Sequence, residues 1–382
     1  GYNYAGIAGI ATAPNGLPNS GLTWETKTQT NLGADLSLFK GRLSLSADYW
    51  TKDTKDLLFQ VALPNTSGYE SFVTNIGEVS NKGFDFQLGG TIIKNDNFSW
   101  NSDFNISFIN NKVKKLPGGN DIQQTERYLF GGVVSILREG GSLGSFYLYE
   151  SNGVFSTAKE AAEAGYIDKI SKSNGGQPVA GDARWVDQNK DGVIDTKDKI
   201  IAGNPIPDFT GGLNNTFKYK GLSLDAFFQF SKGNDVYNNF RTDLVRGFNT
   251  NYLKENLDAW KQEGDITDVP RNVLLDPANN SEGVVARPST RFLEDGSFIK
   301  LKTVTLTYEF PNSVLEKLKL SGLKVYAKGT NLLTITKYSG FDPEVSVAQN
   351  NNAGQNGGFQ FGIDRGLYPL SKSITLGLSL DF

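Results

Sequence analysis

Apolar residues alternate with small or polar ones along the last segment of the chain, residues 369–382, up to a terminal phenylalanine. Because successive side chains of a β-strand point to opposite faces, this pattern predicts a strand with one apolar and one polar face. The apolar positions are Leu370, Ile374, Leu376, Leu378, Leu380 and Phe382.

The same alternation recurs through most of the chain. We therefore predict an all-β protein with about ten strands. The alternating segments are residues 2–10, 32–38, 43–49, 84–92, 100–108, 209–219, 222–230, 304–310, 323–335 and 369–382.

The connections between these segments alternate in length. Short ones fall at residues 40–41, 95–97, 220–221 and 311–322, and long ones at 64–71, 111–207, 238–297 and 339–369. A compact soluble sheet has no reason to sort its loops in this way, whereas outer-membrane barrels have short periplasmic turns and long extracellular loops. The sorting therefore favours a transmembrane antiparallel β-barrel over an edge-stranded soluble sheet.

Aromatic residues gather beside the short connections, as expected for side chains at a membrane–water interface. They are Phe39, Phe98, Tyr219, Phe310 and Phe382. Strand propensity alone would explain aromatic residues in these strands, but not their common level.

Carboxylates recur on the polar faces of the predicted strands. A narrow barrel has room only for packed side chains, so several acidic groups suit a wide, wet or plugged interior. We therefore expect these strands to form part of a larger barrel. The acidic positions are Asp35, Asp48, Asp85, Asp103, Asp225 and Glu309.

Composition removes several classes of function. The chain has no Cys and no His, which excludes disulfides and histidine-based triads within it. A net charge of −3 without a basic run gives no indication of nucleic-acid binding. The 382 residues begin with Gly and contain no Met, so we expect the C-terminal part of a longer secreted precursor. No carboxylate pair is singled out for catalysis, and we predict that the protein is not an enzyme.

One motif has the spacing of a calcium loop. Gly192 takes the sharp-turn position, and Asp198 replaces the usual glutamate at the last position. The alternative is a metal-free polar turn, because Asp, Asn and Gly are common turn residues. We favour a structural Ca²⁺ site that orders a long outer loop. The candidate ligands are Asp187, Asn189, Asp191, Val193 through its carbonyl, Asp195 and Asp198.

Other signals in the long connections are weaker. Residues 251–262 show helical spacing, which predicts a helix packed on its own loop or facing a partner, and residues 158–164 predict a short surface helix. Several loop aromatics could stack on sugar rings or pack within the loops. These aromatics are Tyr147, Tyr149, Trp185 and Tyr237.

Seven phrases and the terminal strand resemble SusC-type TonB-dependent outer-membrane transporters. The phrases occur in order along nearly the whole chain, so the resemblance is specific. They are TNIGEVSNKGFDF at 74–86, REGGSLGSFY at 138–147, GDARW at 181–185, IAGNPIPDF at 201–209, SFIKLK at 297–302, VYAKGTNLL at 325–333 and FDPE at 341–344.

The resemblance implies that residues 1–382 are the C-terminal half of a barrel of about 22 strands whose N-terminal plug is absent from this chain. Residues 111–207 would form a long extracellular excursion carrying the calcium loop, and residues 238–297 a second one. The resemblance also implies a SusD-type lid lipoprotein, TonB acting through the absent N-terminal region, and import of oligosaccharides or peptides across the outer membrane. From the residues alone, a calcium-stabilised surface adhesin or carbohydrate-binding β-sandwich remains the alternative.

Overall fold

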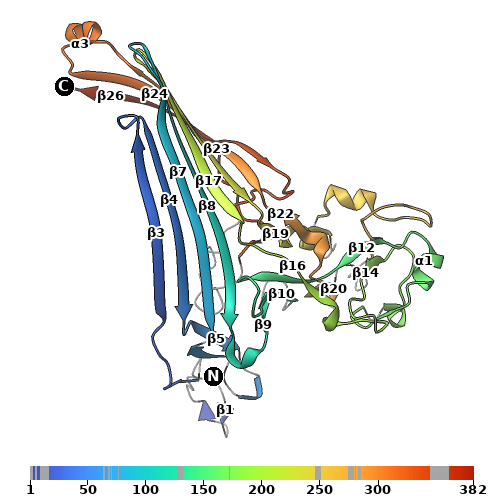
Figure 1. The fold of residues 1–382 in the computed structure, drawn as a ribbon. Helices are drawn as coiled ribbons and strands as arrows, with labels where there is room; N and C mark the ends of the chain where they lie inside the picture. The colour runs from blue at the N-terminus through green and yellow to red at the C-terminus, as the bar shows by residue number, and fades with distance from the viewer. Residues whose placement is uncertain are drawn as a thin grey trace.

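The main feature of the computed structural model is one antiparallel sheet of nine strands (Figure 1). The model describes residues 3–4, 7–8, 17–62, 65–67, 69, 71–75, 77–126, 132–171, 173–245, 251–273, 279, 281–282, 285–344 and 361–382. Each strand of the sheet pairs with the strands of this same sheet that precede and follow it along the chain. The strands are β3 (Thr26–Leu38), β4 (Leu43–Lys55), β7 (Glu78–Lys94), β8 (Phe98–Lys115), β17 (Phe209–Tyr219), β18 (Leu222–Lys232), β23 (Phe298–Glu309), β24 (Gly322–Thr336) and β26 (Ser373–Asp381).

The register of the sheet brings the apolar positions of all nine strands onto one face. Leu45 lies opposite Leu88, which lies opposite Phe104 on the next strand, and one residue away Ser46 lies opposite Gln87. Since paired residues share a face and neighbours along a strand do not, the sheet has one apolar and one polar side. The alternation predicted from the sequence is therefore confirmed in these nine strands.

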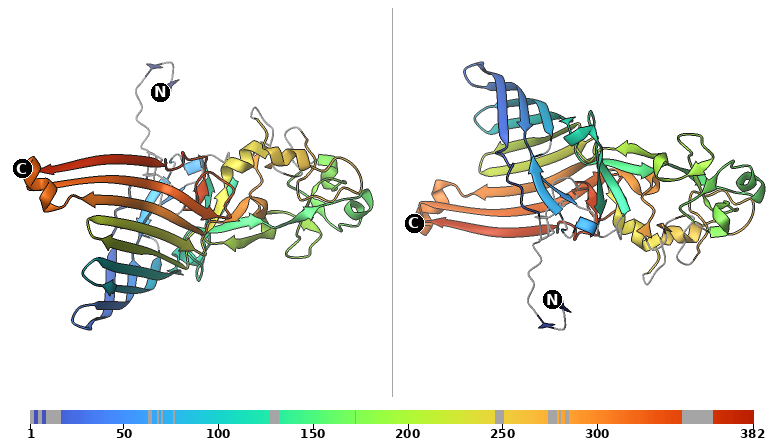
Figure 2. Two further views of the ribbon diagram at one scale, coloured as in Figure 1. Left: turned by 90° about the horizontal axis from the view of Figure 1, so that it is seen from above. Right: turned by 90° about the horizontal axis from the view of Figure 1, so that it is seen from below.

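The apolar face is not covered by the rest of the described chain. Leu32, Ile374 and Leu376 are 75%, 77% and 79% exposed. A β-sandwich would bury such a face against a second sheet about 10 Å away, and the described strands form no such layer. The β-sandwich alternative is therefore wrong. Figure 2 shows the sheet as a curved wall with β3 at one edge and β26 at the other.

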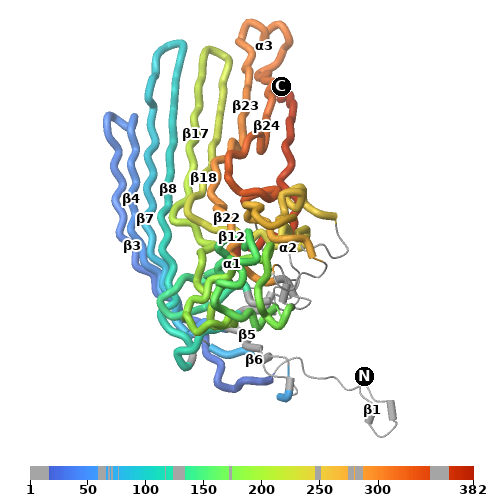
Figure 3. The backbone as a smooth tube through the Cα atoms, turned by 90° about the vertical axis from the view of Figure 1, so that its right-hand side faces the viewer, coloured from blue at the N-terminus to red at the C-terminus, as the bar shows by residue number. Residues whose placement is uncertain are grey.

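The short and long connections lie at opposite ends of the sheet, as predicted. The short ones are residues 39–42, 95–97, 220–221 and 310–321, the last of which contains α3 (Asn312–Leu318). Figures 1 and 3 place α3 and the C-terminus together at this short-turn end. The long ones are residues 56–77, 116–208, 233–297 and 337–372.

Three sequence-based boundaries were wrong. The excursion expected at 111–207 spans 116–208, because Asn111 and Lys112 still pair with β7. The excursion expected at 238–297 begins at residue 233, where β18 ends. The strand expected at 2–10 is not a single strand: β1 (Asn3–Tyr4) pairs with β2 (Ile7–Ala8), and the other residues of that segment lie outside the described residues.

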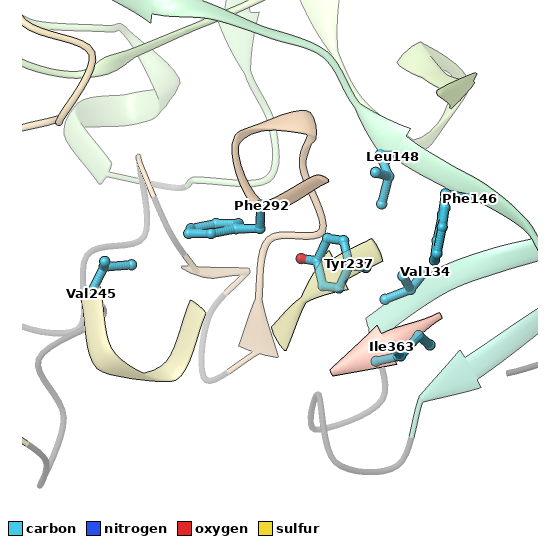
Figure 4. Close-up of a cluster of buried hydrophobic side chains, with 7 residues drawn as sticks. All are labelled: Val134, Phe146, Leu148, Tyr237, Val245, Phe292 and Ile363. Carbon is cyan, nitrogen blue, oxygen red and sulfur yellow. The ribbon is translucent and has the colours of Figure 1, made fainter. Parts of the chain in front are cut away.

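The three longest connections pack together into a lobe, which we define as the described residues of 116–208, 233–297 and 337–372. Figure 4 shows one of its cores, to which each connection contributes: Phe146, Tyr237 and Ile363 are 0%, 0% and 2% exposed. Two further clusters of buried apolar side chains lie within and beside the lobe. The lobe therefore has an interior of its own, unlike the sheet.

The lobe contains only short elements. Its strands are β9 (Ile122–Glu126), β10 (Gly132–Leu137), β11 (Ser145–Tyr149), β12 (Ser151–Val154), β13 (Ile167–Asp168), β14 (Ala183–Trp185), β15 (Val193–Ile194), β16 (Lys199–Gly203), β19 (Asp235–Asn238), β20 (Ser281–Glu282), β21 (Val285–Ala286), β22 (Leu293–Asp295) and β25 (Ile363–Asp364). Its helices are η2 (Pro117–Gly119), α1 (Ala158–Ala162), η4 (Ser173–Gly176), η5 (Thr196–Asp198), α2 (Asn239–Val245), η6 (Lys254–Asp258) and η7 (Thr290–Phe292). The fourth long connection holds β5 (Leu58–Ala62), η1 (Asn65–Ser67) and β6 (Ser71–Asn75).

Of the two predicted lobe helices, one is confirmed. α1 begins after Thr157, whose side chain accepts a hydrogen bond from the Glu160 N–H. The helix predicted over 251–262 is a 3-10 helix limited to η6, and Leu257 on its expected apolar stripe is 69% exposed. None of the described helices has the length and apolar character needed to cross a membrane.

Candidate functional site

The calcium-type loop, residues 187–198, follows β14 in the lobe, contains β15 and η5, and leads into β16. Its turn depends on two left-handed residues, Lys190 at φ 58° and Gly192 at φ 77°. The Asp187 carboxylate accepts the N–H groups of both, at 2.8 Å each. The first ligand position therefore holds the loop in its turned shape.

The remaining candidate ligands also accept backbone hydrogen bonds. The side chains of Asn189 and Asp191 accept the N–H groups two residues ahead, the latter from Val193, at 3.0 Å each. Asp195 and Asp198 form a capping box at the start of η5, and Asp198 is fully buried. The loop is thus closed through its own side chains.

This arrangement bears on whether the loop fits a cation. A carboxylate oxygen that accepts one N–H keeps a second lone pair, so the residue types suit a hard cation such as Ca²⁺. In the described part of the chain, however, no group of three or more His, Cys, Asp or Glu side chains is gathered closely enough to hold a metal ion. The calcium site stays a prediction.

The loop is anchored to the lobe on its apolar side. Val193 and Ile194 pair in parallel with Ile167 and Asp168, and Ile194 is fully buried. The Asp168 carboxylate in turn accepts a hydrogen bond of 2.9 Å from the fully buried Arg287. The calcium-type loop is therefore coupled to two of the three long connections.

The four loop aromatics considered for sugar stacking are buried. Tyr147, Tyr149, Trp185 and Tyr237 are 7%, 1%, 3% and 0% exposed. Burial raises the pKa of Tyr237 well above its usual range. The alternative, packing within the loops, is therefore correct.

A half-open apolar pocket of about 120 Å³ lies beside α2. Phe240 and Phe341 line it, with their ring centroids 5.6 Å apart. Arg241 borders it and is held by Glu255 at 2.7 Å and Glu294 at 3.3 Å. Burial disfavours the charge of Arg241, but the two carboxylates outweigh it and raise the pKa of the guanidinium. The pocket pairs an apolar wall with a fixed cation.

A buried ion-pair cluster ties the last long connection to β23. The Lys300 ammonium, 2% exposed, contacts Asp342 at 2.5 Å and Glu344 at 2.6 Å, and Lys302 contacts Glu344 at 2.6 Å. Burial tends to raise the pKa of Asp342, but hydrogen bonds from Lys300 and the backbone lower it overall. Sequence reasoning missed this cluster, although the opposite charges of FIKLK and FDPE were a signal for it.

The polar face of the sheet carries the acidic side chains predicted for it. Asp48 lies directly opposite Asp85, whose carboxylate accepts hydrogen bonds from the Trp50 indole at 2.8 Å and from the Ser107 hydroxyl. The Trp50 ring lies where a Cβ on Gly83 would fall, which explains glycine at that position. These groups satisfy one another across three strands.

Comparison with known proteins places these features in a family. Residues 1–189 match the β-barrel model of the TonB-dependent receptor-like family. The chain is 38% identical over 366 residues to TonB-dependent receptor P3 of Formosa agariphila, covering 95% of this chain and 35% of the relative. It is 28% identical over 376 residues to TonB-dependent receptor SusC of Bacteroides thetaiotaomicron, covering 95% of this chain and 32% of the relative.

Solved structures agree with these relatives. The chain superposes on the structure of the RagAB peptide transporter with a TM-score of 0.76 and 29% identity, covering all of this chain and 38% of that one. This chain therefore spans about a third of the length of the curated relatives that it matches.

Proposed function

We propose that the chain, a TonB-dependent receptor β-barrel of the SusC type in the outer membrane, serves there as part of a nutrient importer. The observation that carries the proposal is the nine-stranded sheet with one continuous apolar face and one polar face. In a membrane barrel the apolar face contacts lipid and the polar face lines the interior.

The open edges of the sheet support a larger barrel. No strand of the described chain pairs with the outer edge of β3 or β26. In hydrocarbon an unpaired edge costs several kcal/mol for each unsatisfied backbone group, so barrels in membranes are closed. We propose that further strands close a barrel of about 22 strands around a plug, through which TonB would act.

The lobe supports a role in cargo capture at the cell surface. It lies at the long-connection end, which in outer-membrane barrels is extracellular. One relative in structure is named a peptide transporter, and the family resemblance also includes oligosaccharide importers. We propose that the lobe contacts a SusD-type lipoprotein and that the cargo is an oligosaccharide or a peptide.

Growth experiments test the proposed import. A strain lacking the full-length gene would be grown on oligosaccharides or peptides as the sole carbon source, with monosaccharides and free amino acids as controls. We expect a growth defect on one polymer class only, restored by the full-length gene. Equal growth of mutant and parent on both polymer classes would contradict an import role.

We also propose that residues 187–198 bind Ca²⁺ and thereby stiffen the lobe. The support is the ligand spacing together with the left-handed Lys190 and Gly192 and the buried Asp198. Binding to the folded state alone would stabilise the lobe by about 2.7 kcal/mol at a hundredfold excess over the dissociation constant.

Calorimetry of the full-length protein tests the calcium proposal. We expect Ca²⁺ to raise the unfolding temperature of the lobe in the parent protein but not in a D187N/D191N variant. D265N is the matched control, since Asp265 also caps backbone N–H groups in the lobe, at 3.0 and 3.1 Å. An equal calcium response in all three proteins would refute the site.

A further inference from the structure

Three lysines at the short-turn end adopt a backbone conformation that normally favours glycine. Lys40, Lys220 and Lys319 have φ angles of 56°, 52° and 58°. They come from three of the four short connections, and Lys319 occupies the left-handed position that ends α3. A non-glycine residue held in this region costs about 1–3 kcal/mol. Phe39 beside Lys40 has a φ of 54° as well, but lysine takes such a position in three separate connections.

Lys220 is the clearest case of a lysine in a backbone conformation that favours glycine. It shares a two-residue turn with Gly221, yet the positive φ belongs to the lysine and not to the glycine. The turn is held on both sides: the Lys220 N–H donates to the Asn97 carbonyl at 2.9 Å, and the Gly221 carbonyl accepts from the Glu309 N–H at 2.8 Å. The turn therefore presents the lysine side chain from a fixed backbone.

The ammonium groups of Lys40, Lys220 and Lys319 are free to contact a ligand at the short-turn end of the sheet, which we call the rim. In the described chain none of them forms an ion pair with a carboxylate, and the Lys220 ammonium lies 5.4 Å from the centroid of the Tyr219 ring. Two more aromatic rings stand beside this turn, since Tyr308 pairs with Leu222 and its ring packs edge-on against Phe310 at 5.0 Å. Lysine and aromatic side chains together suit the headgroup level of a membrane.

A groove of about 530 Å³ lies in the apolar face, and its lining includes Leu222, two residues after Lys220. It crosses β18, β23, β24 and β26 near the short-turn end, and Figures 1 and 3 place α3 over the same end of β23 and β24. Its lining is almost entirely apolar and includes Leu222, Leu306, Tyr308, Ala327, Leu376 and Leu378.

The groove exists because successive apolar positions of β24 are occupied by smaller and smaller residues. The apolar positions of this strand run from Val325 to Ala327, and Ala327 lies between Leu306 on one side and Leu376 on the other. The next position is Gly329, where the Leu332 side chain takes the space of a Cβ. Ala327 therefore leaves an apolar hollow between Leu306 and Leu376, which an acyl chain of the bilayer could fill.

We propose that this groove and the rim above it form a specific phospholipid site. One acyl chain of a glycerophospholipid would lie along Ala327, and its phosphate would meet the ammonium groups of Lys220 and Lys319. The choice of a glycerophospholipid rests on the proposed barrel orientation, which puts the short turns in the periplasmic leaflet.

Native mass spectrometry of the full-length protein, extracted from outer membranes in mild detergent, tests the groove. We expect one retained glycerophospholipid in the parent protein and its loss in A327W, because the indole would fill the hollow. A47W is the matched control: Ala47 lies on the same face at β4, between Ala34 and Phe86. Equal retention by A327W and A47W would overturn the groove assignment.

The rim is tested by replacing the strained lysine with glycine. K220G removes the charge while relieving the backbone, so we expect unchanged or higher thermal stability together with about fivefold weaker retention of added dipalmitoyl phosphatidylglycerol. K40G makes the same change at the other edge of the sheet, away from the groove, and should retain the lipid. Equal retention by K220G and K40G would show that Lys220 serves only the turn.

The identity of the retained lipid shows which class of membrane lipid occupies the groove. Glycerophospholipid supports the proposal, whereas a lipid A species at the same site would overturn it. Failure of the growth test with lipid retention intact would refute the import function alone. Absence of a retained lipid from the parent protein, with the growth test giving its expected result, would refute this site alone.

Discussion

The sheet and the lobe use the same residue types in opposite ways. Phe108 on β8 is 42% exposed and stands on an uncovered face, whereas Phe146 on β11 is fully buried against Tyr237 in the lobe. The sheet gains its order from a regular ladder of paired strands, while the lobe has short elements around apolar clusters. One part of the chain leaves its apolar surface for lipid and the other hides it from water.

The exposure of the apolar side chains in each region reflects the medium around that region. An apolar face is stable in hydrocarbon without a protein partner, because lipid chains are as apolar as leucine. The lobe has to exclude water by packing, so its interior is dense and intolerant of gaps. Substitutions of the same chemistry should therefore have unequal effects in the two regions.

Truncating a phenylalanine should give the largest contrast. Phe146→Ala removes a fully buried ring and is expected to destabilise the lobe by about 3–5 kcal/mol. Phe108→Ala should cost far less, because lipid can fill the space. Thermal unfolding of the two full-length variants in detergent measures both effects, and equal destabilisation would break the contrast.

Introducing a charge on each surface should destabilise the sheet more than the lobe, which is the opposite of the order expected for the phenylalanine truncations. Ile374→Arg places a cation on the apolar face and is expected to destabilise the barrel by about 2–4 kcal/mol. Ile266→Arg changes a lobe side chain that is 95% exposed and should stay within about 0.5 kcal/mol of the parent. Heat-modifiable gel mobility after refolding into vesicles reports the outcome. A tolerated Ile374→Arg would argue against lipid contact there.

Acid should weaken the ion pairs between Lys300 on β23 and the last long connection. This is the smallest of the three expected effects. The pKa of Asp342 is lowered in the folded protein, so its contribution is present above the ordinary aspartate range and is lost as the pH falls below about 4. Hydrogen exchange of residues 337–344 should therefore rise below that pH. Asp342→Asn should remove the dependence, and Asp258→Asn on the exposed surface should keep it.

The sheet was largely predictable because its signal is local. Alternation needs only neighbouring residues, and Leu45, Leu88 and Phe104 could be placed on one face before their register was known. Strand ends were less accurate, since Asn111 and Lys112 continue β8 with polar side chains on both faces. The short-turn and long-connection ends followed from loop lengths alone.

The lobe was not predictable in the same way, because its contacts join distant residues. Asp168 meets Arg287 across 119 positions, and Lys300 meets Asp342 across 42. Neither pair produces a periodic pattern. Tyr149 and Tyr237 could equally have faced outward, since an isolated loop aromatic carries no sign of its burial. The calcium-type spacing was visible, but spacing alone does not bring its carboxylates together.

The two faces of one strand should meet different media, lipid on one side and water on the other, and spin labels on β7 can distinguish them. Residues 1–382 contain no cysteine, so Leu88→Cys on the apolar face and Gln87→Cys on the polar face can each be labelled singly in full-length protein in vesicles, once any cysteine outside this segment has been replaced. We predict that the label at position 88 is relaxed by lipid-soluble oxygen and the label at 87 by a water-soluble nickel complex. Equal accessibility of both labels to the nickel complex would show that both faces of β7 meet water and that the apolar face does not contact lipid.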